Sequence, residues 1–175
     1  MRITVSGPPG SGTTSLAKYL VNKHHFSLIS AGDIFRGLAA DKNMDLAEFG
    51  RLAEDDESVD LMIDARQKEI GEARDNIIIE GRLAGHMIDN ADIRIWVAAS
   101  VECRSVRISD REEIDPQTAV ELTIEREDCE AGRYHKYYNI DINDLTPYDL
   151  VINSEVWGVE DIGAIVDVAI AGLKE

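Results

Sequence analysis

The sequence is poor in cysteine and in long apolar runs, and both shortages narrow its possible functions. Its two cysteines, Cys103 and Cys129, have no metal-ligand spacing, so free thiols in a reducing cytoplasm are the default expectation. No apolar run approaches the length that crosses a bilayer, and Met1 leads directly into a strand-like segment without a signal-peptide pattern. We therefore expect a cytoplasmic protein with no membrane partner.

Positive charge is also scarce. The 175 residues include 34 acidic side chains against 18 lysines and arginines, which gives a formal net charge of −16. This excess argues against a nucleic-acid partner, because binding a polyanion depends on neutralising many phosphates. A small phosphate ligand needs only a local cluster of cations and stays possible. Only six of the 18 cations are lysines; the other twelve are arginines, whose planar forks suit phosphate.

A glycine-rich turn near the N-terminus has the context of a phosphate-binding loop. It lies between a short apolar strand and a helix-compatible stretch, so glycine N–H groups and the helix N-terminus could both face phosphate oxygens. The spacing Gly7-x4-Gly12 followed by Thr14 fits the P-loop pattern, except that Thr13 stands in the lysine place. An ordinary strand–helix turn is the alternative, and the missing lysine supports it. We expect phosphate binding by Gly7, Pro8, Pro9, Gly10, Ser11, Gly12, Thr13, Thr14 and Ser15.

Strand-like runs recur along the chain, with helical patterns between them. They are Arg2–Ser6, Phe26–Ser30, Asn76–Glu80, Ile93–Ala98 and Leu150–Asn153. Several of them, including Ile77–Ile79 and Leu150–Ile152, are continuously apolar, which is typical of strands covered on both faces. The pattern predicts one α/β domain over residues 1–175, with a doubly wound parallel sheet. Ligands of such sheets bind beyond the carboxyl ends of the strands, so the residues after each strand are candidates for a site.

Candidate residues follow the second and third strands. Ser30 and Asp33 have capping-box spacing, which predicts a helix that carries Arg36 about one turn from its start. Taken alone, Arg36 is better explained as a surface arginine. Glu80 ends the third strand, where a carboxylate beside a P-loop is well placed to hold Mg²⁺, usually through water. Arg82 follows two residues later, and a solvated arginine in a tight turn is the alternative there.

Arginines also recur after the fourth strand. Arg104, Arg107 and Arg111 fall at i, i+3 and i+7 on one predicted helical face, and Arg126 and Arg133 lie two turns apart on the next helix. Like charges one turn apart cost an isolated helix roughly 0.2–0.5 kcal/mol, which an anionic ligand would relieve. A solvated face, paired with neighbouring glutamates, explains any one of these arginines equally well.

Together these segments resemble the nucleoside monophosphate kinases, and within them the archaeal-type cytidylate kinases. The likeness rests on Gly-Pro-Pro-Gly-Ser-Gly-Thr-Thr in the loop, Glu-Phe-Gly-Arg-Leu-Ala at Glu48–Ala53, Glu-Gly-Arg-Leu-Ala-Gly from Glu80, and Tyr-Asp-Leu-Val-Ile-Asn at Tyr148–Asn153. It runs from Arg2 to about Trp157. That family also carries threonine at the lysine place, so Thr13 is compatible with activity.

The resemblance implies a five-stranded P-loop fold with acceptor-binding helices at about residues 33–74 and a mobile lid at about 104–138. It implies that ATP phosphates bind Gly7–Ser15, that Thr14 and indirectly Glu80 hold Mg²⁺, and that Asp33, Arg36 and Arg82 bind the acceptor. The implied reaction transfers the γ-phosphoryl group of ATP to CMP, with dCMP as a second acceptor, to give CDP and ADP. We expect a monomer or weak dimer.

Because the loop lacks a lysine, arginines are expected to supply the missing charge. The catalytic candidates are Arg82, Arg107, Arg111, Arg126 and Arg133, and Arg126 and Arg133 lead among them. Two other functions stay open. One is a kinase of the same fold for another monophosphate or a small metabolite. The other is a regulator that binds ATP without transferring phosphate, for which Thr13 is the best support.

Overall fold

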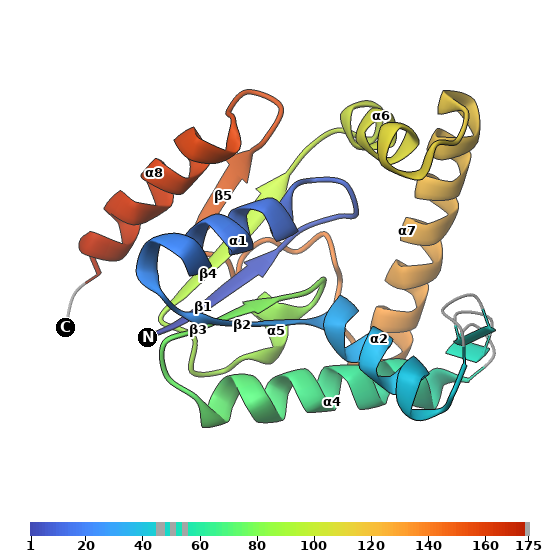
Figure 1. The fold of residues 1–175 in the computed structure, drawn as a ribbon, viewed down its shortest axis with the longest axis horizontal. Coiled ribbons are helices and arrows are strands. Elements are labelled where there is room, and N and C mark those ends of the chain that lie inside the picture. The colour runs from blue at the N-terminus through green and yellow to red at the C-terminus, as the bar shows by residue number, and fades with distance from the viewer. Residues whose placement is uncertain (45–47, 50–51, 54–55, 174–175) are drawn as a thin grey trace.

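The computed structural model describes residues 1–44, 48–49, 52–53 and 56–173. Within this part of the chain, five parallel strands form one sheet in the order β2-β3-β1-β4-β5 (Figure 1). They are β1 (Arg2–Ser6), β2 (Ser27–Ser30), β3 (Ile77–Glu80), β4 (Ile93–Ala98) and β5 (Leu150–Asn153). The expected parallel sheet is confirmed. Two strands start one residue later than predicted, after Phe26 and Asn76, and Asn76 has a φ of 53°, a left-handed conformation that belongs to a turn.

Helices cover both faces of this sheet. The described ones are α1 (Thr13–His24), α2 (Ala31–Asp41), α4 (Glu57–Ala73), α5 (Ala84–Met87), α6 (Val101–Glu112), α7 (Pro116–Tyr138) and α8 (Val159–Ala171). On one face, Leu16 of α1 and Val166 of α8 share an apolar core with Ile95. On the other face, α5 packs beside β3, and Tyr134 of α7 packs with Trp96 of β4. This is the predicted doubly wound arrangement.

The continuously apolar strands differ in how they are buried. Ile78 of β3 belongs to the core under α1 and α8, whereas Ile77 and Ile79 belong to the cluster on the opposite face, and all three are fully buried. The prediction of cover on both faces is therefore confirmed for β3. It is wrong for β5, where Val151 is 48% exposed. The reason is that β5 is an edge strand, paired only with β4 among the described strands.

Local capping explains where the helices at the carboxyl edge of the sheet begin. Ser30 Oγ accepts a hydrogen bond from the Asp33 backbone N–H, so the predicted capping residue of α2 is confirmed. At the start of α7, the Asp115 carboxylate accepts from two backbone N–H groups, and Pro116 takes the first helical position, where its missing N–H costs nothing. These caps fix the residues at which α2 and α7 begin.

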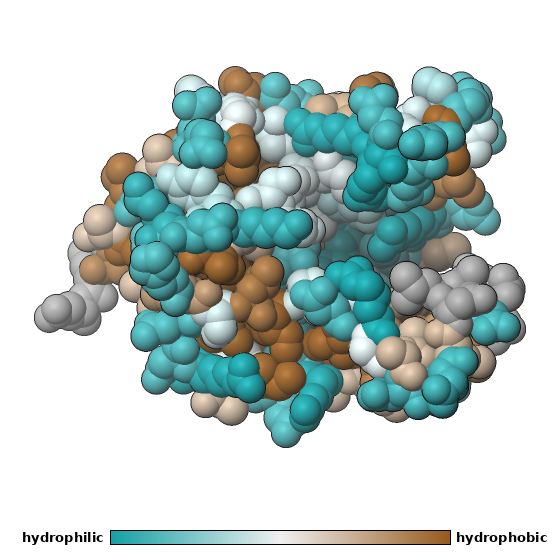
Figure 2. All heavy atoms as spheres, in the orientation of Figure 1, coloured by the Kyte–Doolittle hydropathy of each residue, from teal (hydrophilic) through white to brown (hydrophobic). Residues whose placement is uncertain are grey.

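A hollow opens at this edge of the molecule. The surface is indented between α2 on one side and the arm formed by α6 and α7 on the other (Figure 2). α7 runs from α6 past the sheet toward α4 (Figure 1). An apolar cluster that includes Phe35, Ala39, Phe49 and Val59 holds α2 against α4. The hollow is thus bounded by the two helical regions expected to bind the acceptor and to form the lid.

Part of the expected acceptor-binding region lies outside the described residues. Of the segment Glu48–Ala53, Gly50 and Arg51 are not among them. Within the described ranges, no helix combines the length and apolar character needed to span a membrane.

Candidate phosphoryl-transfer site

The loop between β1 and α1 is shaped by glycines with positive φ. Gly10 has φ 82° and Gly12 has φ 102°, values that residues with a side chain rarely adopt. A Cβ atom on Gly10 would also lie 2.9 Å from the backbone oxygen of Arg104, so α6 packs directly on the loop. α1 begins at Thr13, and Gly12 before it provides no side-chain cap, which leaves the first N–H groups of the helix available for an anion. This geometry is that of a phosphate-binding loop.

Three oxygen-bearing side chains meet at the end of the loop. Thr13 Oγ1 donates to Glu80 Oε1 at 2.8 Å, and Thr14 Oγ1 lies 3.4 Å from the same oxygen. They come together because β1 and β3 are neighbours and Val5 is in register with Glu80. Hydroxyl and carboxylate oxygens are the ligands that Mg²⁺ prefers, so Thr14 and Glu80 fit the predicted metal role. The glutamate is long enough to reach the loop.

Arg82 lies in a largely buried network with two glutamates of α7. Its side chain is 13% exposed; its Nε lies 3.2 Å from Glu130 Oε2 and its Nη2 lies 3.6 Å from Glu127 Oε1. The guanidinium also lies over the Trp96 ring, 5.7 Å from the centroid. Desolvation lowers the pKa of Arg82, and the two glutamates oppose that change. A hollow of about 250 Å³ beside Pro8 is lined by Arg82 and Glu127, among others.

Arg104 is a member of the site that sequence reasoning did not select. Its side chain is 3% exposed, and its Nη1 donates to the Pro9 carbonyl at 3.1 Å and lies 2.7 Å from Glu127 Oε1. Its Nε donates to the Ala99 carbonyl at 3.1 Å. Arg104 therefore ties the loop to both α6 and α7. The available signal in the sequence was the i, i+3 spacing of Arg104 with Arg107. That spacing did not distinguish a buried arginine that holds the loop from an arginine on a solvated helix face.

Arg107 and Arg111 lie in different surroundings although they share a helix. Arg107 Nη1 donates to the Gly10 carbonyl at 3.2 Å and to Ser154 Oγ at 2.9 Å, and Ser154 Oγ donates to the Ser11 carbonyl at 2.6 Å. Arg107 thus braces the loop against the turn after β5. Arg111 is 62% exposed and pairs with its neighbour Glu112 at 2.6 Å, so the structure does not bring it to the loop.

The remaining candidate arginines are paired with carboxylates. Arg126 Nε donates to Glu130 Oε1 at 2.8 Å, while its side chain stays 61% exposed. Arg36 Nη2 lies 2.5 Å from Asp33 Oδ1 on α2, and both side chains are more than half exposed. Arg133 pairs with a carboxylate of α4 rather than with the loop.

Two other buried polar residues near the site were not selected as candidates from the sequence. Glu130 is 6% exposed, although the sequence suggested a solvated partner for nearby arginines. Gln67 of α4 is 3% exposed and donates to the Glu80 carbonyl at 2.7 Å. In the sequence, Gln67 belongs to a polar stripe with Asp60, Asp64 and Arg66, whose groups could read a base edge, but such a stripe more often marks a solvated face.

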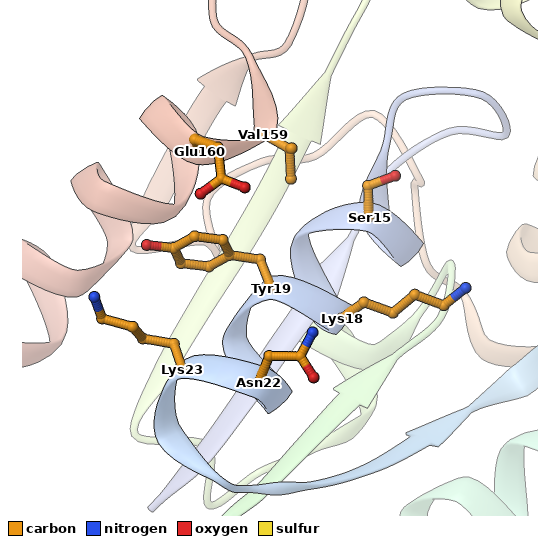
Figure 3. A pocket seen from close by; sticks show the side chains of 7 residues that line it. All are labelled: Ser15, Lys18, Tyr19, Asn22, Lys23, Val159 and Glu160. Carbon is orange, nitrogen blue, oxygen red and sulfur yellow. The ribbon is translucent and has the colours of Figure 1, made fainter.

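A second hollow lies away from this site. It has a volume of about 500 Å³ and lies between α1 and the start of α8 (Figure 3). Ser15, the last of the predicted phosphate-binding residues, lines it. Lys18 and Lys23 also line it, but their ammonium groups extend in different directions (Figure 3). The lysines therefore do not converge on one ligand position.

A P-loop at the carboxyl edge of a parallel sheet, with hydroxyl and carboxylate oxygens at its end and arginines on both sides, defines a P-loop phosphotransferase. More narrowly, the chain belongs to the cytidylate kinase-like family, whose model matches residues 2–156. The predicted family is confirmed.

Relatives and solved structures agree with this assignment. The chain is 58% identical to a cytidylate kinase of Methanocorpusculum labreanum, over 99% of this chain and 98% of the relative. It is 61% identical to one of Methanoculleus marisnigri, over 99% and 96%. A shikimate kinase from Bacteroides thetaiotaomicron superposes with a TM-score of 0.67 at 12% identity, over 98% of both chains. A gluconokinase from Sinorhizobium meliloti gives 0.62 at 11% identity, over 97% of this chain and 91% of that one. These two likenesses show the fold alone.

Proposed function

We propose that the protein transfers the γ-phosphoryl group of ATP to CMP, giving CDP and ADP, and that dCMP is a second acceptor. The observation that supports phosphoryl transfer is the contact of Thr13 and Thr14 with Glu80 at the phosphate loop. The acceptor follows from relatives named cytidylate kinase that are 58–61% identical over nearly their whole length.

The residues of the site divide into donor and acceptor sides. The backbone N–H groups of Gly7–Ser15 would hold the ATP phosphates, and Thr14 and Glu80 would hold Mg²⁺, which neutralises phosphate charge when bound. Arg36 and Arg82 would bind the phosphate of CMP, with Asp33 keeping Arg36 in place. From α7, Arg126 would approach the transferring group as the arm closes over the hollow.

The transfer needs little covalent help from the protein. An oxygen of the CMP phosphate attacks the γ-phosphorus, the new phosphorus–oxygen bond forms, and the bond to the β–γ bridging oxygen breaks, leaving ADP. Positioning the two phosphates and neutralising their charge supply most of the rate, so a protein base is not required. Closure of the arm would also exclude water, which competes as an acceptor.

The wider setting is also a proposal. We infer a monomer or weak dimer that acts in the cytoplasm without a nucleic-acid partner. The two free cysteines, Cys103 and Cys129, fit a reducing compartment, and the net charge of −16 disfavours binding to a polyanion.

A panel of acceptors tests the proposed function. With Mg-ATP, we expect ADP production to be fastest with CMP and comparable or slower with dCMP. ADP release is measured for each common nucleoside monophosphate at matched concentrations. If AMP or UMP were clearly the best substrate, the acceptor would be wrong while the kinase class survived. ATP binding without acceptor-dependent ADP production would instead indicate a regulator.

Glu80→Gln should raise the Mg²⁺ concentration needed for half-maximal rate. The amide cannot carry the negative charge that holds the cation beside Thr14, and changes around a metal site typically cost about 10–100-fold in metal affinity. The measurement is a Mg²⁺ titration of the initial rate at fixed ATP and CMP. Glu72→Gln is the control, because Glu72 is a carboxylate of α4 that lies 3.8 Å from Lys68. An unchanged Mg²⁺ requirement in Glu80→Gln would remove Glu80 from the metal site.

A further inference from the structure

A polar seam joins the first half of α4 to the second half of α7. Arg133 Nε lies 2.6 Å from Asp60 Oδ2, and Tyr138 Oη donates to Asp64 Oδ2 at 2.8 Å. Burial raises the pKa of Asp64 to about 6, against the opposing hydrogen bond from Tyr138. Holding two desolvated carboxylates at a helix contact is costly, which calls for a reason beyond packing.

This seam starts beside the transfer site. Asp60, Asp64 and Gln67 fall at i, i+4 and i+7 and so share one face of α4. Gln67, at the inner end, donates to the carbonyl of Glu80, two residues before Arg82. Asp60 lies seven residues before Gln67, about 10 Å along a helix. The seam therefore leads along α4, away from the expected position of the acceptor phosphate.

Glu130 links the two ends electrostatically. Its Oε2 lies 3.2 Å from Arg82 Nε. Burial raises the pKa of Asp60, the charge of Arg133 opposes that change, and the negative charge of Glu130 adds to it. Asp60 and Arg133 thus belong to the same charged neighbourhood as the phosphate-binding arginine. They are also accessible, since their side chains are 20% and 29% exposed.

The ion pair leaves hydrogen-bonding capacity on both partners. Among the described residues, the contact between Nε and Oδ2 leaves Asp60 Oδ1 as an acceptor and the two Nη groups of Arg133 as donors. Acceptor and donors side by side match cytosine, whose exocyclic amine donates next to a ring nitrogen and a carbonyl that accept. Uracil presents a carbonyl oxygen in place of the amine, and that oxygen would face the carboxylate.

We propose that Asp60 and Arg133 read the base of the acceptor nucleotide and select an amino-bearing pyrimidine over a keto one. Asp60 Oδ1 accepts from the exocyclic amine, and Arg133 donates to the ring nitrogen or carbonyl. Asp64, which accepts a hydrogen bond from Tyr138, lies one turn after Asp60 on the same face of α4. This reading rests on the proposed function. It assigns Arg133 to the base instead of the transferring phosphoryl group, and the two roles have different kinetic signatures.

Asp60→Asn tests the proposal because the amide keeps the size of the carboxylate but can donate to a carbonyl oxygen. We expect the ratio of kcat/KM for CMP to kcat/KM for UMP to fall roughly 10–100-fold, the range for one well-placed base contact. An equal loss with both nucleotides would overturn the proposal. Arg133→Lys, which keeps the charge but loses the planar fork, should also lower the ratio. A fall in kcat of the same size for CMP and UMP would return Arg133 to the phosphoryl group.

Glu57→Gln is the matched control. Glu57 pairs with Lys136 at 3.1 Å, so it is a second ion pair between the same two helices, but its partners are 52% and 70% exposed. Its substitution should leave the ratio unchanged. A shift equal to that of Asp60→Asn would mean that the ratio reports only the docking of α4 on α7, which would overturn the proposal. A wild-type protein that does not use CMP would remove the proposed function itself. Normal CMP turnover with an unshifted ratio in Asp60→Asn would remove the base reading alone. If Asp60→Asn does not fold, Arg133→Lys carries the same test.

Discussion

Arg82→Ala should lower kcat/KM for CMP by an amount equivalent to about 2–4 kcal/mol, the expected loss of one desolvated charge–phosphate contact. Arg82 is placed for this role because it follows β3 at the carboxyl edge of the sheet, two residues after Glu80, and is 13% exposed. Steady-state kinetics with ATP saturating and CMP varied would measure the loss. Near-normal turnover would show that Arg82 is not a phosphate ligand.

The structure changes what this substitution should do to stability. The sequence alone predicts that Arg82 lies beyond a strand end rather than in the core, so that its loss would damage turnover far more than folding. In the structure it is largely buried and pairs with Glu130, which would be left with Arg126 alone. Breaking a buried pair by removing one partner costs about 3–5 kcal/mol, so we expect Arg82→Ala to melt earlier than the wild type.

A control separates the two effects. Arg94 is another partly buried arginine, but its Nη2 donates to the carbonyls of Ile88 and Asp89, both at 2.9 Å, away from the loop. Arg94→Ala should lower the melting temperature without lowering kcat/KM of the folded protein. If the two variants lost activity in proportion to their melting temperatures, Arg82 would be a structural residue. Arg82→Lys, which retains the charge, should recover part of the stability and less of the activity.

The fold could be predicted because its signals are local. The three isoleucines of β3, the glycine-rich turn after β1 and the cap at Ser30 each indicate an element within a few residues of sequence. Val151 shows the limit of such signals. Its strand has the same apolar pattern as β3, but its place at the edge of the sheet depends on which strands pair, and no local pattern encodes that.

The charged network could not be predicted for a related reason. Glu127 and Glu130 lie 45 residues or more after Arg82 in the chain, and ion pairs at such separations leave no periodic trace. Sequence spacing revealed only same-helix neighbours such as Arg126 and Glu130. Arg104 was overlooked because burial by contacts with Pro9 and Glu127 depends on how α6 and α7 pack on the loop.

Arg126→Ala should lower kcat roughly 10²–10⁴-fold, the range for cations that act mainly in the transition state. The loop has threonine where a lysine is usual, and the neutral Thr13 hydroxyl, which donates to Glu80, supplies no positive charge. Arg126 lies on the arm formed by α6 and α7, where its side chain is 61% exposed and its Nε pairs with Glu130 at 2.8 Å. ATP affinity should change much less than kcat, and steady-state kinetics with an ATP titration would measure both.

Arg66→Ala is the control for Arg126, because Arg66 is 56% exposed and pairs with Glu69 three residues away on α4, remote from α7 in sequence. Loss of such a surface pair costs at most about 1 kcal/mol of stability and should leave kcat unchanged. Equal kcat values in Arg66→Ala and Arg126→Ala would defeat the assignment of the missing charge to Arg126. A Thr13→Ala variant that abolished turnover by itself would defeat it as well. In that case the Thr13 hydroxyl, through its hydrogen bond to Glu80, would perform the role assigned to Arg126. An arginine on α7 that supplied the missing charge would have preserved turnover when the hydroxyl was removed.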